Sequence, residues 1–435
     1  METELAERFR DTETGREAQE LMRPCVRCGQ CTFVCPTFRV VDDEWDGPRG
    51  RIHMINKFFE DKDPGSDIQR HLDRCLTCRS CEASCPQGVR YGRLLDIARV
   101  EVEKRIPRPF SDRLARQMLR AVVTNRRRFT ALLRIAQATR AILPDKLRSR
   151  IPERRSAGAW PDRAHARTML AWQGCVQPSL APDVNAAAAR VLDRFGIRLS
   201  AAEAGCCGAL SQHLAATGEA LALMRRNIDA CWPQIEAGAE AIVMTSSGCG
   251  AHLRDYGFHL RDDPDYRDKA RRISEITRDI SEVVTAEWRD DLLPVPARSA
   301  SGRPQGPRIA FQSPCSLQHA EKLNGVVEKL LKRAGFRLTQ AAYGFMCCGA
   351  AGSYSVLQPE LAQALRARKL ETLLACRTET IATANVGCMV HLAAASPVPV
   401  RHWIELLDET LATRAEPSAT AREARAASDA ATASS

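Results

Sequence analysis

Two short cysteine runs are the residues of this chain best suited to chemistry. The stretch CVRCGQCTFVCP covers residues 25–36, and CLTCRSCEASCP repeats its spacing at residues 75–86. Both read C-x2-C-x2-C-x3-C-P. Three thiolates two residues apart on a short loop can point at one iron–sulfur cubane, and the fourth, before proline, normally reaches the other cluster in two-cluster ferredoxins. The spacing therefore predicts two [4Fe–4S] clusters.

The crossed pattern assigns a ligand set to each cluster. The predicted ligands are Cys25, Cys28, Cys31 and Cys85 for the first cluster, and Cys75, Cys78, Cys81 and Cys35 for the second. Structural zinc is the competing interpretation, but it favours two C-x2-C pairs far apart in sequence and fits these runs poorly. A fully ligated cubane has no open coordination position. We therefore expect electron transfer at these sites and no catalytic residue.

The remaining cysteines form a duplicated pattern in the second half of the chain. In each copy an apolar run ends at one cysteine, a CCG motif follows, and a further cysteine closes the pattern. The copies comprise Cys175, Cys206, Cys207 and Cys249, then Cys315, Cys347, Cys348 and Cys388. Buried structural cysteine is the alternative. It does not explain the duplication, although it suits Cys231 and Cys376, for which we expect plain packing.

Alternating strands and helices must position these cysteines. In each copy an apolar, strand-like run is followed by a helical stretch, which Gly196 or Gly335 closes before the next strand. The last cysteine of each copy ends a strand-like stretch, AEAIVMTSSGC (239–249) or TETIATANVGC (378–388). The alternation predicts two α/β units with small, mostly parallel sheets. Because the ends of such strands meet in one crevice, each copy should gather four thiolates into a metal site.

The fold class expected is α+β multidomain, with an α-helical ferredoxin-like N-terminal domain followed by two α/β cysteine-rich domains. The proline- and glycine-rich stretch PVPARSASGRPQGP reads as a linker, and the C-terminal stretch is poor in bulky apolar residues, so we expect it to be disordered. The predicted boundaries are 1–105 (ferredoxin-type), 106–165 (basic helical connector), 166–293 (first cysteine-rich), 294–307 (linker), 308–412 (second cysteine-rich) and 413–435 (tail).

The net charge of +10 is concentrated in the connector. Between Glu101 and Arg163 there are 17 Lys and Arg residues against 6 Asp and Glu residues. Apolar residues recur there at helical spacing, namely Leu114, Met118 and Val122, then Leu132, Ile135, Ala136 and Leu143. Two helices that pack on the ferredoxin-like part are one interpretation, and contact with an anionic membrane surface is another. Nucleic-acid binding is disfavoured, because aromatic content is 5% and no known module surrounds the patch.

Composition and targeting signals favour a cytoplasmic protein. The chain has 435 residues, of which 44% are hydrophobic and 27% charged, as in ordinary soluble proteins. Its first residues lack the apolar stretch of a signal peptide, and no run reaches the roughly 18–20 apolar residues that span a bilayer. In a reducing compartment, eighteen cysteines indicate metal or redox chemistry instead of disulfides. We expect a peripheral position on the cytoplasmic face of the inner membrane.

The combination of motifs resembles the iron–sulfur subunit of glycolate oxidase, with heterodisulfide reductase, lactate-utilisation and anaerobic glycerol-3-phosphate dehydrogenase subunits as relatives. The resemblance covers roughly residues 1 to 412 and is more specific than the cysteine runs alone. It rests on DGPRGRI (46–52), HLDRCLTCRSCEASCPQGVRYGRLLDIAR (71–99), EAGCCGA (203–209), SSGCGAH (246–252), SLQHAEKLNG (316–325), CCGAAGSY (347–354), TANVGC (383–388) and VRHWIELL (400–407).

The resemblance implies a complex in which FAD-containing partner subunits oxidise glycolate to glyoxylate. This chain would carry the electrons one at a time towards a quinone-type acceptor. No G-x-G-x-x-G fingerprint follows a predicted strand, and no Ser–His–Asp order stands out, which agrees with substrate chemistry on partners. The alternatives are the equivalent subunit of a lactate or glycerol-3-phosphate dehydrogenase, or a heterodisulfide-reductase-like thiol redox subunit.

One departure from the resemblance concerns the last cysteine of each copy. In heterodisulfide reductase relatives a further cysteine stands three residues before it, which gives five thiols per site. Here Ser246 and Asn385 occupy that position. Four thiols per site suit a [4Fe–4S] cluster or zinc and argue against disulfide cleavage.

Overall fold

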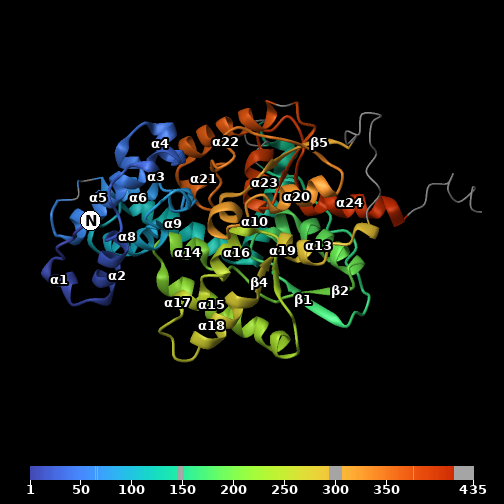
Figure 1. The fold of residues 1–435 in the computed structure, drawn as a ribbon, viewed down its shortest axis with the longest axis horizontal. Coiled ribbons are helices and arrows are strands. Elements are labelled where there is room, and N and C mark those ends of the chain that lie inside the picture. Colours follow the sequence, from blue (N-terminus) through green and yellow to red (C-terminus); the bar gives the residue numbers. More distant parts are fainter. Residues whose placement is uncertain are drawn as a thin grey trace, which may run out of the picture.

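The computed structural model describes residues 1–415 except 64, 66, 145–147, 149–150, 293–305 and 376. A helical N-terminal module (α1–α8) lies against two α/β units (Figure 1). We call these units the first repeat (β1–α19) and the second repeat (β5–α24). The expected fold class is confirmed. The predicted domain boundaries remain a proposal, and most of the predicted linker and tail, together with Cys376, lie outside the described residues.

The N-terminal module is a set of short helices around an apolar core. Met22, Ile55, Phe59 and Leu94 are fully buried in it. Its elements are α1 (Glu7–Arg10), α2 (Glu13–Met22), α3 (Gln30–Phe33), α4 (Pro36–Val41), η1 (Glu44–Asp46), α5 (Pro48–Phe59), α6 (Ile68–Asp73), α7 (Ser80–Ala83) and α8 (Tyr91–Arg105).

The first repeat alternates strands and helices, as the sequence predicts. Its strands pair in the order β2-β1-β3-β4, and every pairing is parallel. Its elements are β1 (Arg167–Ala171), α12 (Gln177–Leu180), α13 (Pro182–Arg194), β2 (Ile197–Ala201), α14 (Ala209–His213), α15 (Thr217–Glu236), β3 (Ile242–Met244), α16 (Ser247–Leu253), α17 (Tyr256–His259), α18 (Arg267–Ile276), β4 (Thr277–Asp279) and α19 (Ile280–Ala286).

The second repeat has the same topology, with parallel strands in the order β6-β5-β7-β8. The identical order confirms the duplication. Its elements are β5 (Arg308–Gln312), η4 (Ser316–Ala320), α20 (Val326–Arg333), β6 (Arg337–Thr339), α21 (Tyr354–Leu357), α22 (Pro359–Leu374), β7 (Thr380–Thr383), α23 (Val386–Ala393), β8 (Val400–His402) and α24 (Trp403–Ala415).

Two helices end at glycines, and two strands end before the last cysteine of their repeat. Gly196 and Gly335 have φ of 79° and 95°, so each closes its helix in the left-handed region before the next strand, as predicted. The prediction that Cys249 and Cys388 end strands is wrong. β3 and β7 stop earlier, and both cysteines lie in the first turn of the helix that follows, α16 or α23.

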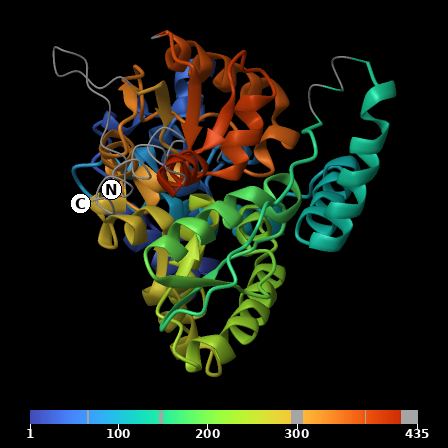
Figure 2. The ribbon, with the colours of Figure 1, turned by 90° about the vertical axis from the view of Figure 1, so that its right-hand side faces the viewer.

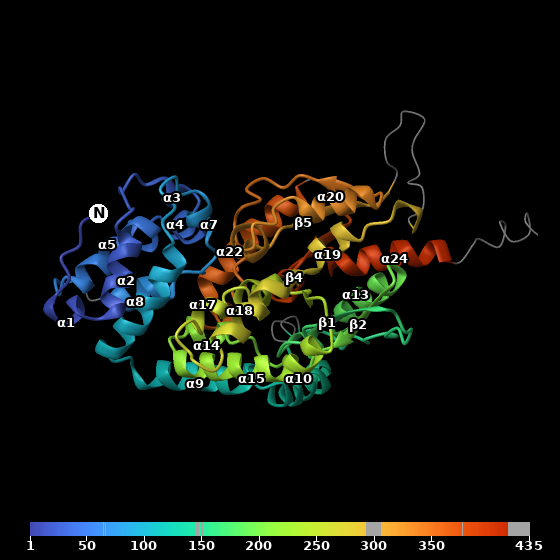
Figure 3. The ribbon, with the colours of Figure 1, turned by 60° about the horizontal axis from the view of Figure 1, so that its bottom comes forward.

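The two repeats share one apolar core. Helix α13 packs along α24, and α19 lies against α20 (Figure 3). Trp403 and Ile404 at the start of α24 are fully buried in this core, together with Val191 and Leu192 of α13. The packing holds the two sheets, and with them the two cysteine patterns, in a fixed relation.

The connector forms a helical hairpin, α9 (Phe110–Val123) and α10 (Arg126–Thr139), followed by η2 (Arg140–Ile142). It lies along the first repeat at the edge of the molecule (Figure 2). The interpretation in which the two helices pack on the ferredoxin-like part does not account for Leu114, Met118, Leu132 and Ile135, because these side chains are exposed. No helix in the described part of the chain is both long and apolar enough to cross a membrane.

Candidate metal centres

The structure brings Cys25, Cys28, Cys31 and Cys85 to the wall of one cavity. Residues from both runs therefore meet, with the last cysteine of the second run beside the first three of the first run. Burial, with the neighbouring Cys25 thiol, raises the pKa of Cys31 to about 11. A thiol with so high a pKa stays protonated at neutral pH unless a metal displaces the proton.

The complementary set, Cys35, Cys75, Cys78 and Cys81, lines a second cavity. Burial raises the pKa of Cys78 and of Cys81 well above the ordinary value, and nearby thiols add to the effect. Pro48, Cys81 and Tyr91 line both cavities, so the two sites adjoin. The crossed arrangement expected from the spacing is the one that these residues can adopt, while the ligand assignment itself remains a prediction.

Left-handed backbone turns point the thiols into these cavities. In the first run φ is 56° at Arg27 and 84° at Gly29, and in the second run it is 51° at Thr77 and 56° at Arg79. The four positions match pairwise between the runs. A non-glycine residue in this region costs on the order of 1 kcal/mol. Three such residues in two short loops indicate that the loops keep a strained conformation in order to bind a group between the thiols.

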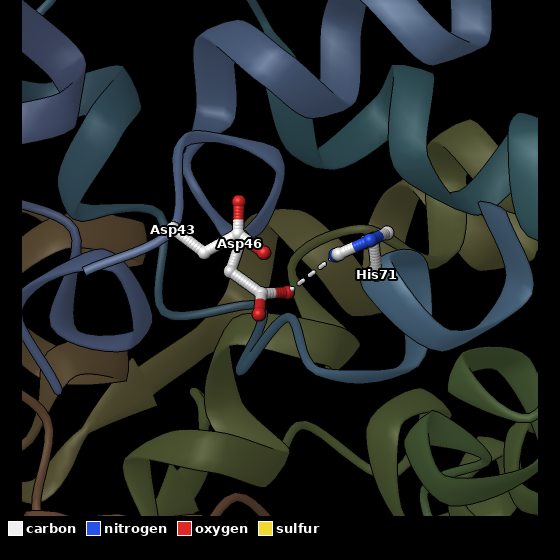
Figure 4. Close-up of side chains that lie close together, drawn as sticks. All are labelled: Asp43, Asp46 and His71. Atoms are coloured by element: carbon white, nitrogen blue, oxygen red, sulfur yellow. Dashed lines mark hydrogen bonds and ion pairs between the residues drawn. The ribbon is translucent and has the colours of Figure 1, made fainter. Parts of the chain in front are cut away.

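Asp46 and His71 belong to an ion-pair network (Figure 4). The network includes Arg51, which lines the second cavity. Asp43, Asp46 and His71 are close enough to suggest a metal site. However, the fully buried Asp46 carboxylate already contacts the His71 imidazole at 2.9 Å and accepts from Arg74 at 2.7 Å and from Arg51 at 3.4 Å. Two guanidinium groups would repel a metal ion at this place. The cluster is therefore structural.

Arg51 connects this network to the thiols. It is 1% exposed, donates from Nε to the carbonyl of His71 at 2.7 Å, and donates from both terminal nitrogens to the Thr37 hydroxyl at 3.3 Å. That hydroxyl lies 3.2 Å from the Cys35 sulfur. Desolvation lowers the pKa of the Arg51 guanidinium, but Cys75 and Cys35 among other groups outweigh it and raise that pKa overall. A buried cation thus stands beside the second cavity.

In the first repeat the thiols interact in a chain that runs from Cys175 through Cys206 and Cys207 to Cys249. Hydrogen bonds from Cys175 and Cys207 lower the pKa of Cys206 well below its ordinary value. The pKa of Cys207 is raised instead, by its thiol neighbours and by burial. All four predicted cysteines therefore gather at one place.

The second repeat gathers its four cysteines in the same way. The Cys315 and Cys347 sulfurs lie 3.8 Å apart, and those of Cys348 and Cys388 lie 3.2 Å apart. The left-handed Gly349, with φ of 91°, leaves no room for a side chain, because a Cβ there would come within 2.6 Å of the Ala362 carbonyl oxygen. The glycine of the CCG motif therefore lets the cysteine loop pack against α22.

A buried lysine distinguishes the second repeat. Lys369 on α22 is 3% exposed and donates to the Gly344 carbonyl at 3.0 Å. Burial lowers its pKa, while the nearby thiols of Cys348 and Cys347 favour its charged form. On the corresponding helix α15 the neutral Asn227 lies near the cysteines and donates to the Cys206 carbonyl at 2.7 Å. The two repeats thus offer different electrostatic surroundings.

Ser246 and Asn385, the residues at the position of the missing fifth thiol, are N-caps. Asn385 caps α23 by accepting from the backbone N–H groups of Gly387 at 2.8 Å and Cys388 at 3.4 Å. Its amide also donates to the Ser247 hydroxyl of α16 at 3.4 Å. Asn385 therefore positions Cys388 through the backbone and helps to join the two repeats.

The N-terminal module and the second repeat meet at their cysteines. Cys78 and Cys315 interact electrostatically, as do Cys347 and Cys78. Leu76, beside Cys78 in the second run, is buried with Met346 and Cys347 in one small apolar cluster. The second N-terminal cavity therefore abuts the cysteine site of the second repeat.

The donor sets fit the predicted metal groups. Each site offers four thiols, and sulfur donors select iron–sulfur clusters or zinc. In the N-terminal module the thiols surround a cavity, as a cluster requires. In the repeats four close thiols also suit zinc, since a tetrahedron of sulfurs about 2.3 Å from zinc has edges of about 3.8 Å. The residues thus fit the groups, and both alternatives stay open for the repeats.

Sequence patterns did not reveal Arg51 and Lys369. Arg51 belongs to the quoted DGPRGRI motif, so it was visible as a motif residue without a role. Lys369 lies in an ordinary helical stretch, and only the packing of α22 shows that it is buried. Cys231, for which packing was predicted, is fully buried in the core of the first repeat, which raises its thiol pKa to about 12.

Comparisons with known proteins agree with this architecture. The family model described as "4Fe-4S dicluster domain" matches residues 21–89, and the one described as "Cysteine-rich domain" matches residues 169–254 and 309–393. The glycolate oxidase iron–sulfur subunit of Escherichia coli (strain K12) is 47% identical over 413 residues, which cover 94% of this chain and 99% of that protein. The chain belongs to the glycolate oxidase iron–sulfur subunit family.

Weaker similarities extend to other proteins. A probable glycolate oxidase iron–sulfur subunit from Bacillus subtilis (strain 168) is 26% identical and covers 85% of this chain and 87% of its own length. Lactate utilization protein A from an Exiguobacterium strain is 24% identical but covers only 54% of this chain, and 94% of itself. A hypothetical protein from Helicobacter pylori shares the fold, with a TM-score of 0.53 at 9% identity over 92% of this chain and 73% of that one.

Proposed function

We propose that this chain is the iron–sulfur electron-transfer subunit of a glycolate oxidase whose flavoprotein subunits oxidise glycolate to glyoxylate. The observation that carries the proposal is the 47% identity to a glycolate oxidase iron–sulfur subunit over almost the whole of both chains. The adjoining cysteine sites support it, because an electron relay needs carriers close together. No group in the described sites resembles a machinery for C–H cleavage, so substrate chemistry is assigned to the partners.

The eight N-terminal cysteines are the proposed ligands of two [4Fe–4S] clusters. Cys25, Cys28, Cys31 and Cys85 would hold one cluster, and Cys35, Cys75, Cys78 and Cys81 the other. When bound, such clusters supply one-electron carriers whose potentials depend on nearby charge and hydrogen bonds. The chain contributes the left-handed loops that aim the thiols, the apolar core that excludes water, and the buried Arg51 cation.

The cysteines of the two repeats are proposed as two further metal sites. They comprise Cys175, Cys206, Cys207 and Cys249, and Cys315, Cys347, Cys348 and Cys388. Cys78 and Cys315 pack against the same apolar cluster. This proximity favours an iron–sulfur cluster in the second repeat, since a redox-inactive zinc ion there would end the series of carriers. Lys369 would offset part of the negative charge of four thiolates at that site.

We further propose a quinone-type acceptor and a peripheral position on the cytoplasmic face of the inner membrane. A flavin partner gives up two electrons singly, and a quinone takes up two. A series of one-electron carriers can therefore connect them. Quinones dissolve in the bilayer, which requires that the complex reach the membrane surface.

Two alternatives are less well supported. A lactate or glycerol-3-phosphate dehydrogenase subunit would look similar, because the partners choose the substrate. The lactate-utilisation relative, however, matches only about half of this chain. Thiol chemistry of the heterodisulfide reductase kind is disfavoured by Asn385, which serves as a helix cap at the place of a fifth thiol.

The test is anaerobic reduction of the clusters by substrate. The chain is purified together with its flavoprotein subunits, and glycolate, D-lactate and glycerol 3-phosphate are added in parallel while cluster reduction is followed by EPR and visible bleaching. Reduction by glycolate first and fastest supports the proposal. Reduction by dithionite but not by glycolate would leave an iron–sulfur protein of a different complex.

A further inference from the structure

The helical hairpin α9–α10 exposes an unusual amount of apolar surface. Of the twelve large hydrophobic side chains that are exposed in the described part of the chain, six lie on the hairpin or on η2 directly after it. They are Phe110, Leu114, Met118, Leu132, Ile135 and Ile142, and their exposed fractions range from 43% to 82%. Exposed apolar patches of this kind mark sites of interaction.

Five of the six side chains form two helical stripes, and Ile142 lies on η2 after them. Phe110, Leu114 and Met118 follow one another at intervals of four residues along α9, so they share one face. Leu132 and Ile135 stand three residues apart on α10 and likewise share a face.

Ion pairs fix which side of α9 faces the protein. Arg116 donates to Asp73 of the N-terminal module at 2.7 Å, and Arg120 donates to Glu219 of the first repeat at 3.0 Å. On α10 the Thr130 hydroxyl lies 2.6 Å from that of Ser179. These contacts hold the hairpin to the body along its other faces, so none of the described residues covers the stripes.

The hairpin is strongly basic around the stripes. Arg113, Arg126, Arg127, Arg128 and Arg134 are exposed. The one acidic residue of the two helices is Asp112, and its carboxylate accepts from Arg108 at 3.0 Å and from Arg116 at 3.0 Å. The exposed arginines are therefore not neutralised by the hairpin itself.

A basic pocket continues this surface at the end of α10. Its described lining includes Arg134, Arg140, Arg148 and Arg154. Among these described residues Glu153 is the single acidic one, and it pairs with Arg140 at 3.0 Å. A pocket with this excess of guanidinium groups suits a phosphate group, which guanidinium binds through paired hydrogen bonds.

We propose that the α9–α10 hairpin docks the protein on an anionic phospholipid bilayer. The apolar stripes enter the boundary between headgroups and acyl chains, and the arginines contact lipid phosphates. Helices of this length lie in the interface and do not span the bilayer. The inference deepens the proposed function, because it names the surface by which the relay reaches a quinone in the membrane. A protein partner is the competing occupant. A lipid surface fits better, because arginines surround both apolar stripes and line the adjoining pocket, and an anionic bilayer can contact all of them.

The experiment uses sedimentation with vesicles of phosphatidylcholine alone or of phosphatidylcholine with about 30% phosphatidylglycerol. The protein, purified with its flavoprotein partners, should bind the anionic vesicles at least about tenfold more strongly and release them at high salt. The double variant Met118→Glu/Ile135→Glu should lose about tenfold or more of this binding. The control Val356→Glu changes a residue that is 62% exposed in the second repeat and should bind as the wild type does.

Three results would overturn the inference: no preference of the wild type for anionic vesicles, unchanged binding by the folded double variant, or loss of the flavoprotein partners from that variant while vesicle binding persists. The last result would make the hairpin the docking surface for those partners. Circular dichroism and iron content establish that the variant is folded. Since vesicle binding needs neither glycolate nor quinone, binding without quinone reduction would contradict the proposed acceptor and leave this inference standing.

Discussion

Cys78 of the N-terminal module and Cys315 of the second repeat lie at one buried contact, although most of the chain separates them in sequence. Burial raises the pKa of Cys78, and the Cys315 thiol raises it further. Both cysteines pack against the cluster of Leu76, Met346 and Cys347. Side-chain packing alone brings the N-terminal cysteine runs to the duplicated cysteine pattern. The following predictions test what that arrangement does.

The crossed ligand assignment predicts which variants resemble one another. Cys35→Ser should disturb the same cluster as Cys75→Ser, because Cys35 lines the cavity of the second run. Cys85→Ser should match Cys25→Ser instead. EPR spectra of the dithionite-reduced variants provide the comparison. If Cys35→Ser matched Cys25→Ser, each run would bind its own cluster and the crossed assignment would fail.

Lys369→Met should lower the reduction potential of the centre in the second repeat. A buried cation favours the more negative, reduced form of a cluster, so its loss should cost a few tens of millivolts, on the order of 1 kcal/mol. EPR-monitored redox titration measures the change. Lys329→Met, on the exposed surface of the same repeat, is the matched control. Equal potentials in the two variants would show that Lys369 has no electrostatic role.

Arg51→Met should destabilise the N-terminal module by about 3–5 kcal/mol, since it leaves the buried Asp46 carboxylate short of a cation. Arg49→Met on the same helix removes an exposed ion pair with Glu44 and should cost less than about 1 kcal/mol. Urea unfolding of the cluster-loaded protein, followed by cluster absorbance and circular dichroism, compares the two. Similar midpoints for both variants would contradict the structural role of the Asp46 network.

We predict that the stability of the protein depends on pH through the buried Asp279 carboxyl. Burial raises the pKa of its carboxyl from 3.8 to about 6. The folded protein therefore holds this proton more tightly than the unfolded chain does. The resulting contribution of Asp279 to the free energy of unfolding is complete below about pH 4 and is lost as pH rises through about 6. The loss is on the order of 3 kcal/mol.

Asp279→Asn keeps a capping side chain for α19 and removes the charge. The variant should be more stable than the wild type at pH 7.5, and its stability should change less between pH 4.5 and 7.5. Thermal unfolding at both pH values measures this, with the exposed Asp268→Asn as the control. A pH profile identical to that of the wild type would refute the assignment.

The sequence predicted the fold class and the duplication, because cysteine spacing and strand–helix alternation are local patterns. It placed Cys249 and Cys388 on strands, since TSS and TAN continue an apolar run. Ser246 and Asn385 are residue types preferred at helix N-caps, but the strand interpretation extended through them. The exposure of Met118 and Ile135 could not be predicted from the sequence either. A stripe at helical spacing looks the same whether it is buried or not, and only the ion pairs of Arg116 and Arg120 decide which face of α9 meets the protein.

Electron transfer through this chain is the central claim, and one measurement tests it most directly. Complexes with wild-type chain, Cys78→Ser, or the packing-cysteine control Cys231→Ser are mixed anaerobically with glycolate and a soluble quinone, and flavin and quinone reduction are recorded separately. We predict flavin reduction in all three complexes, but quinone reduction only in the wild type and in Cys231→Ser. Full quinone reduction by Cys78→Ser would contradict the account, because electrons would then bypass this chain.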